Sequence, residues 1–84
     1  MNIEEIQNFL DKHELPKGKY LKIQFKKRDA IYGLFVKDRD YNDLKSKNFW
    51  RIVTLPHFEE YYKSKNINLA KIFNGTEFSK LSVV

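Results

Sequence analysis

The chain has 84 residues, of which 42% are hydrophobic and 15% are aromatic. This length leaves room for one small domain, over residues 1–84, and the apolar content suits a packed core rather than a disordered segment. The length excludes a doubly wound dinucleotide-binding fold, an α/β-hydrolase and a kinase, because each of these needs several βαβ units or two lobes.

The charge balance favours one class of ligand, and the lack of cysteine excludes two kinds of structural site. Sixteen basic and eleven acidic residues give a net charge of +5, which favours the binding of nucleic acid or another polyanion. Thirteen of the basic residues are Lys, in a chain also rich in Asn and Ile, so AT-rich coding is an alternative explanation of the same charge. Without cysteine there is no disulfide framework and no thiolate zinc site.

No membrane partner and no export signal are expected. No basic stretch leads into an apolar one near Met1, and the longest apolar runs are three residues, which is far short of a bilayer span. We therefore expect a cytoplasmic protein.

Residues 2–12 are predicted to form a short amphipathic helix. Its apolar residues recur at helical spacing, at Ile3, Ile6, Phe9 and Leu10. Asn2 and Glu5 form a capping-box pattern ahead of them. The helix is expected to end at residues 15–18, because Pro16 lacks an amide donor and Gly18 relaxes the backbone.

Residues 19–27 and 30–36 are predicted to form the first two strands. In the first, apolar and polar residues alternate, as in a strand with one buried face. In the second, Gly33 lies between Ile31 and Phe35 on one face. A glycine in this position indicates strong bending or a close backbone approach, and strong bending is what closes a short sheet into a barrel.

The middle of the chain is predicted to contain a loop, a strand and a helical insertion. Residues 37–48 are highly charged, so we expect an exposed loop. Residues 49–54 are aromatic and β-branched, which favours a third strand. Pro56 suits the first turn of a helix, so residues 55–66 are predicted to be a short helical insertion before the fourth strand.

The last two strands are predicted over residues 68–73 and 76–83. They flank Asn74-Gly75, the dipeptide most compatible with a type I′ hairpin turn. The predicted fold is therefore mainly β with one N-terminal helix, as a small, strongly bent five-stranded barrel.

Two segments resemble the motifs of the Sm-like family, which includes the bacterial Hfq proteins. The first carries the apolar positions and bending glycine of the first Sm motif, at Leu21, Ile23, Phe25, Ile31, Gly33 and Phe35, followed by residues 38–42. The second, residues 73–81, is similar to the second motif, an apolar residue and a glycine followed by spaced apolar residues. The family's base-stacking position falls on Asp40 and its basic pocket position on Asn74, so the pocket chemistry differs.

This resemblance implies an Sm-like barrel, with a Src-homology-3-like barrel as the other small-barrel form. In Sm-like proteins the subunits join into rings by pairing their edge strands, and single-stranded RNA lies against inward-facing loops. Carried over to this chain, Asn42, next to Tyr41, would contact a base edge. Asn74 and Gly75 would form the second half of the pocket.

An aromatic and basic cluster is the second candidate surface. The predicted nucleic-acid-binding residues of this cluster are Trp50, Arg51, Tyr62, Lys63 and Lys65. Aromatic rings provide stacking platforms for bases, and lysines attract phosphate. The alternative is that these rings are core, with the helical insertion covering them.

No catalytic, metal or cofactor site is predicted. Tyr61 and Lys65 have the Tyr-x-x-x-Lys spacing of short-chain dehydrogenases, but the same spacing recurs at Tyr41 and Lys45, and the chain has no Gly-x-Gly-x-x-Gly cradle. The two histidines are isolated in sequence, which is not metal-ligand spacing.

Two functions therefore remain open. The first is a non-enzymatic barrel that binds single-stranded nucleic acid, most simply RNA, as a homo-oligomer. The second is a protein-interaction module that docks a protein partner on its aromatic face or adds a strand to an open sheet edge.

Overall fold

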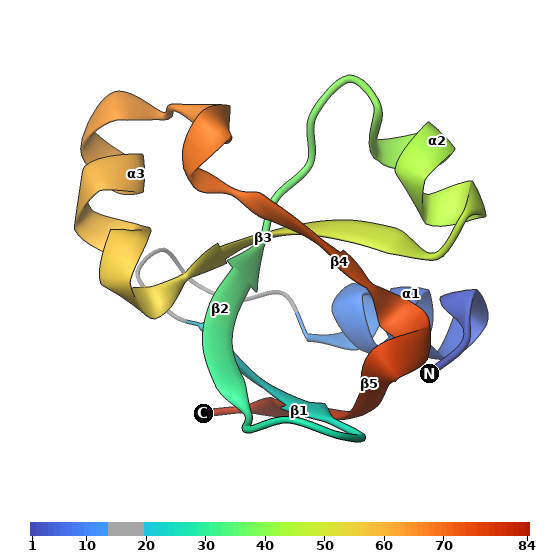
Figure 1. The fold of residues 1–84 in the computed structure, drawn as a ribbon. Coiled ribbons are helices and arrows are strands. Elements are labelled where there is room, and N and C mark those ends of the chain that lie inside the picture. The colour runs from blue at the N-terminus through green and yellow to red at the C-terminus, as the bar shows by residue number, and fades with distance from the viewer. Residues whose placement is uncertain (14–19) are drawn as a thin grey trace.

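A computed structural model describes residues 1–13 and 20–84 of the chain. Its helices and strands are α1 (Ile3–Lys12), β1 (Leu21–Phe25), β2 (Ile31–Phe35), α2 (Tyr41–Ser46), β3 (Phe49–Thr54), α3 (Phe58–Ser64), β4 (Lys71–Asn74) and β5 (Phe78–Val83). Short 3-10 turns occupy Leu55–His57, Ile67–Leu69 and Gly75–Glu77. All five strands form one antiparallel sheet in the order β4-β3-β2-β1-β5 (Figure 1).

Helix α1 begins where its sequence predicts. The side chain of Asn2 accepts a hydrogen bond from the Glu5 amide at 2.8 Å, and the Glu5 carboxylate accepts one from the Asn2 amide at 3.0 Å, so the capping box is confirmed. The helix ends at Lys12, with His13 as its C-cap. The predicted stop at residues 15–18 lies outside the described residues. One face of α1 buries Ile6 completely in the core.

The sheet is strongly bent but is not closed into a barrel. Figure 1 shows a curved β2 that links a half made of β1 and β5 to a half made of β3 and β4. Within the described residues, β4 pairs with β3 alone and β5 with β1 alone, so both remain sheet edges. A Cβ on Gly33 would lie 2.5 Å from the Ile52 side chain, which confirms the predicted close approach at this glycine.

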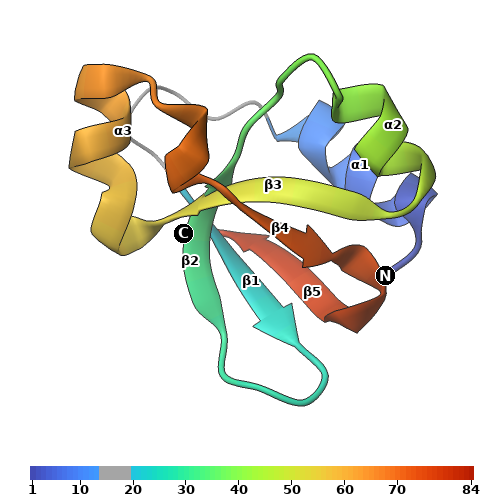
Figure 2. The same ribbon diagram turned by 45° about the horizontal axis from the view of Figure 1, so that its top comes forward.

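Strand β3 is buried on both faces, because its neighbours Ile52 and Val53 point to opposite sides of the sheet. Ile52 belongs to the main core, with Ile6, Ile23, Phe25, Trp50, Phe78 and Leu81. Val53 belongs to a second cluster on the other face, with Val36, Phe58 and Ala70. Helix α1 packs on the main core and α3 on the second cluster, and Figure 2 shows the two helices near opposite ends of β3.

Two predictions in the middle of the chain need correction. Residues 37–48 are not a loop throughout, because they contain α2. Tyr41, the first residue of α2, is half-buried against the main core, a tertiary contact that local charge does not reveal. The predicted fourth strand begins later than expected, since Ile67–Leu69 is a 3-10 turn and β4 starts at Lys71. The helical insertion is confirmed as Leu55–His57 followed by α3.

The predicted hairpin between the last two strands is wrong. A type I′ turn needs a positive φ at both central residues, but Asn74 has φ −86° and its side chain accepts a hydrogen bond from the Thr76 amide at 3.0 Å. The strands on either side pair with different neighbours. Gly75 is needed for space instead: a Cβ there would lie 2.6 Å from Ile6 and 2.7 Å from the Trp50 indole nitrogen.

Candidate nucleic-acid interface

The nine predicted binding residues fall into two groups on different parts of the sheet. Six lie around the start of β3, on α2, on β3 itself and at the junction of β4 and β5: Tyr41, Asn42, Trp50, Arg51, Asn74 and Gly75. The other three, Tyr62, Lys63 and Lys65, lie on or beside α3, which packs on the second cluster. The structure therefore does not bring all nine onto one surface.

Asn48 connects two members of the first group, Trp50 and Gly75, and no sequence pattern pointed to it. Its side-chain oxygen accepts a hydrogen bond from the Trp50 indole at 2.7 Å, and its side-chain nitrogen donates to the Met1 carbonyl at 3.0 Å. Its backbone carbonyl accepts a hydrogen bond from the Gly75 amide at 2.8 Å. Asn48 is buried and has a φ of 61°, a left-handed conformation that Asn tolerates better than most residues. It thus joins the β2–β3 connection to the β4–β5 junction.

Trp50 is a core residue and offers no face to a base. Its side chain is 2% exposed, and its ring meets those of Phe35 and Tyr41 edge to face. Its indole nitrogen is also satisfied internally, by Asn48. The prediction that Trp50 stacks on nucleic acid is therefore corrected: alternate residues of β3 point inward, and this one fills the core.

Arg51 is held by an internal ion pair. Two guanidinium nitrogens of Arg51 donate to the two carboxylate oxygens of Asp40, at 3.2 and 2.5 Å. This bidentate pairing lowers the pKa of Asp40 and raises that of Arg51, in both cases chiefly through the side-chain hydrogen bonds. A phosphate would have to compete with Asp40 for this guanidinium, so Arg51 is a weaker phosphate contact than its sequence position implied.

Tyr41 is half-buried at the start of α2. Its hydroxyl donates a hydrogen bond to the Gln7 side chain of α1 at 2.8 Å, and the ammonium of Lys37 lies 5.1 Å from its ring centre. Burial raises the pKa of Tyr41, and the nearby Asp11 carboxylate raises it further, while the Gln7 hydrogen bond acts in the opposite direction. The phenol is therefore protonated at neutral pH.

The remaining members of this first group differ in how easily a ligand could reach them. Asn42 is exposed on α2, where a ligand can reach it. The side-chain oxygen of Asn74 accepts hydrogen bonds from both the amide and the hydroxyl of Thr76, at 3.0 and 2.8 Å. Gly75 is buried against the core. Of the two predicted halves of the pocket, the half on α2 is the more accessible.

The residues on α3 serve the second cluster. Tyr61 and Tyr62 pack against that cluster, and their rings meet edge to face. The ammonium of Lys65 lies 5.5 Å from the centre of the Tyr61 ring and 5.0 Å from that of Tyr62, while Lys63 is exposed. Phe58 at the start of α3 is buried in the second cluster, whereas Trp50 belongs to the main core, so α3 does not cover the Trp50 ring as the alternative predicted.

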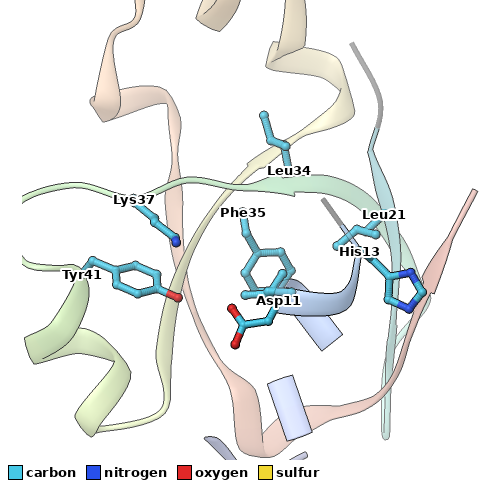
Figure 3. A pocket seen from close by; sticks show the side chains of 8 residues that line it. Asp11, His13, Leu21, Leu34, Phe35, Lys37 and Tyr41 are labelled. Atoms are coloured by element: carbon cyan, nitrogen blue, oxygen red, sulfur yellow. The ribbon is translucent and has the colours of Figure 1, made fainter. Parts of the chain in front are cut away.

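A hollow of about 310 Å³ lies beside the first group, between the end of α1, β2 and the β2–β3 connection (Figure 3). Asp11, His13, Lys37 and Tyr41 contribute polar side chains to it, and Phe35 lies at its centre in Figure 3. Sequence reasoning did not find this hollow, because its walls come from segments far apart in the chain.

Within residues 1–13 and 20–84, no three His, Asp or Glu side chains gather where they could hold a metal ion. In the same part of the chain, no helix combines the length and apolar character needed to cross a bilayer. No protein-family model, no curated protein and no solved structure matches this chain.

Proposed function

We propose that this protein is a non-enzymatic, Sm-like module that binds single-stranded RNA in the cytoplasm. The observation that carries the proposal is the topology: a helix followed by five antiparallel strands in the order β4-β3-β2-β1-β5, with a sharply curved β2. The hydrogen bond from the Gly75 amide to the Asn48 carbonyl supports it, because it ties residues 73–81, which resemble the second motif, to the segment that follows residues 38–42 of the first.

In this proposal the RNA contacts come from the exposed side of α2. Asn42 is exposed there, and Lys45 and Lys47 follow it along the same segment. The net charge of +5 attracts the phosphate backbone, while the polar side chains contact base edges. Trp50 and Arg51 support the surface from within, through the core and the pair with Asp40.

The two sheet edges support assembly of several copies. Ile72 on β4 and Val83 on β5 are each 50% exposed, at edges whose outer backbone groups pair with no strand in the described residues. Exposed apolar edges are templates for strand pairing. We propose that β4 of one copy pairs with β5 of the next, in a closed homo-oligomer.

Fluorescence anisotropy with a labelled uridine-rich or adenine-rich oligonucleotide tests the RNA proposal. Affinity should fall as salt rises, with a logarithmic slope of about −0.7 for each phosphate neutralised. The variant Lys45→Ala/Lys47→Ala should weaken binding several-fold. Lys63→Ala/Lys65→Ala removes the same charge near α3 and should leave binding nearly unchanged.

The outcomes of this experiment separate three cases. A larger loss from the α3 variant would move the interface to that face, and equal losses would mean that only net charge matters. No detectable binding at ~50 mM salt would end the RNA proposal, because electrostatic binding is strongest at low salt.

The exposed edge of β4 also favours a second candidate, a protein-interaction module that accepts a strand from a protein partner. Light scattering distinguishes the two, since an RNA-binding ring has the mass of several chains. A monomer without affinity for oligonucleotides would favour the interaction module.

A further inference from the structure

The hollow between α1, β2 and the β2–β3 connection has an apolar floor and a charged rim. Leu10, Leu21 and Phe35 supply apolar surface from three elements. Small-molecule sites combine such a lining with a few polar groups that fix orientation, and a volume of about 310 Å³ lies at the small end of their range. The hollow is therefore of a size for one flat ring system rather than for a peptide.

The rim carries opposite charges that do not neutralise each other. Asp11 comes from the last turn of α1 and Lys37 from the segment after β2. Asp40 and Arg51 form the single ion pair of residues 1–13 and 20–84, so Asp11 and Lys37 are not in contact. Figure 3 shows the Asp11 carboxylate, the Lys37 ammonium and the Tyr41 hydroxyl pointing into the same opening beside Phe35.

A series of hydrogen bonds positions the Asp11 carboxylate, which is the acceptor group of the rim. The Tyr41 hydroxyl donates to the Gln7 side-chain oxygen, and the Gln7 side-chain nitrogen donates to one oxygen of Asp11, each at 2.8 Å. An ionised carboxylate has about four lone-pair positions, so this bond leaves acceptor capacity on Asp11. Lys37 is a donor only, with its ammonium held near the Tyr41 ring.

We propose that this pocket binds a guanine base through its Watson–Crick edge. Guanine presents two adjacent N–H donors, at N1 and N2, next to the carbonyl acceptor O6. Asp11 accepts from the two donors, Lys37 donates to O6, and the flat ring lies along Phe35. Adenine and cytosine present one amino donor beside a ring acceptor, and uracil presents one imino donor between two carbonyls, so none of them offers the paired donors that Asp11 requires.

This proposal rests on the proposed RNA function only in that RNA would supply the guanine. The same chemistry recognises a guanine within RNA and a free guanine nucleotide, so the experiment includes both. Binding is followed by two-dimensional amide NMR of the full chain during titration with guanosine monophosphate, inosine monophosphate or adenosine monophosphate. A short oligonucleotide with one guanine, and its uridine counterpart, provide the RNA arm.

The expected result is saturable shifts around Asp11 and Lys37 with the guanine nucleotide. Affinity should drop about tenfold with inosine, which lacks the N2 amino group, and further with adenosine. Asp11→Asn and Lys37→Met should each weaken guanine binding about tenfold or more. The matched controls Asp29→Asn, between β1 and β2, and Lys80→Met on β5 should leave it unchanged, since neither exposed side chain lines the pocket.

Equal affinity for guanine and adenine nucleotides, or no shift at these residues with any ligand, would overturn the guanine assignment. Loss of binding in the control variants as well would also overturn it. Asp11 and Lys37 are exposed, so their variants should remain folded, and the same spectra verify this.

The RNA function is judged separately, by the Lys45→Ala/Lys47→Ala variant. If the guanine oligonucleotide binds and free guanosine monophosphate does not, the natural ligand is RNA. If both bind equally well, the free nucleotide is the ligand.

Discussion

The side-chain oxygen of Asn48 accepts a hydrogen bond from the indole of Trp50 at 2.7 Å, inside the core and only two residues along the chain. Asn48 makes this contact from a left-handed backbone, with a φ of 61°. The same residue receives the Gly75 amide and donates to the Met1 carbonyl. Asn48 thus joins the β2–β3 connection, which carries α2 of the candidate interface, to the β4–β5 junction.

Replacing Asn48 should therefore destabilise the fold strongly. In Asn48→Ala the buried indole N–H of Trp50 loses its acceptor, and alanine must adopt the same left-handed backbone. We expect a loss of about 2–4 kcal/mol in the free energy of unfolding, from an unsatisfied donor plus backbone strain. Urea denaturation, followed by Trp50 fluorescence, measures it.

Asn48→Gly separates the two causes, because glycine adopts a positive φ without strain but supplies no acceptor. It should recover roughly 1 kcal/mol relative to Asn48→Ala. Equal stability of the two variants would assign the whole effect to hydrogen bonding, and wild-type stability in both would contradict the role of Asn48.

The elements that the sequence predicted correctly are those decided by local patterns. The capping box of Asn2 and Glu5 and the alternation in β1 act within a few residues, so they can be read directly. The junction at Asn74 and Gly75 was misread because its hairpin preference is local, whereas the structure uses Gly75 for its missing Cβ against Trp50. The requirement for glycine at this position comes from core residues that are distant in the sequence and leave no room for a Cβ.

The candidate site was less predictable than the fold. Asp40 and Arg51 are neighbours only because β3 brings them together, so their mutual neutralisation is invisible in the sequence. For Trp50 the sequence leaves both binding and core packing open, because either of two adjacent strand residues can face inward. Asp11 and Lys37, which line the pocket, are ordinary charged residues by pattern, and only the packing of α1 against β2 makes them neighbours.

The close approach at Gly75 leads to a second prediction, that Gly75→Ala is destabilising. The added Cβ would collide with the side chains of Asn48, Ile6 and Trp50, all of which are held in the core. Overpacking of this kind costs about 1–3 kcal/mol. Thermal unfolding of Gly75→Ala measures the cost.

Gly33→Ala is the comparison for this measurement. Its Cβ would meet the Ile52 side chain at 2.5 Å and the Val53 carbonyl at 3.2 Å, so one contact falls on backbone that cannot rotate away. We expect both variants to be destabilised. A melting temperature that stays at the wild-type value in either variant would mean that the sheet relaxes around the methyl group there.

The pair of Asp40 and Arg51 predicts a loss of stability in acid. The pKa of Asp40 is lower in the folded protein than its ordinary value of 3.8, chiefly because of its hydrogen bonds from Arg51. The unfolded chain therefore binds a proton on Asp40 more readily. The stabilisation is complete above 3.8 and is lost as the pH falls through the lower, folded pKa.

Asp40→Asn tests this dependence, since an amide does not titrate in this range. Urea unfolding between neutral and acidic pH should show a smaller acid-induced loss in the variant than in the wild type. Asp43→Asn, on the exposed side of α2, is the control and should follow the wild-type curve. Parallel curves for wild type and Asp40→Asn would show that the pair contributes nothing to acid sensitivity.

The arrangement of the pocket predicts the titration of Tyr41. Burial is the main cause of its raised pKa, and the negative charge of Asp11 adds to it. Asp11→Asn removes that charge, so the pKa of Tyr41 should fall toward 10.0 but stay above it, because burial remains. Carbon-13 NMR of labelled tyrosine side chains measures the pKa residue by residue. Asp43→Asn should leave the Tyr41 pKa in place, and an unchanged value in Asp11→Asn would show that the carboxylate does not face the hydroxyl across the pocket.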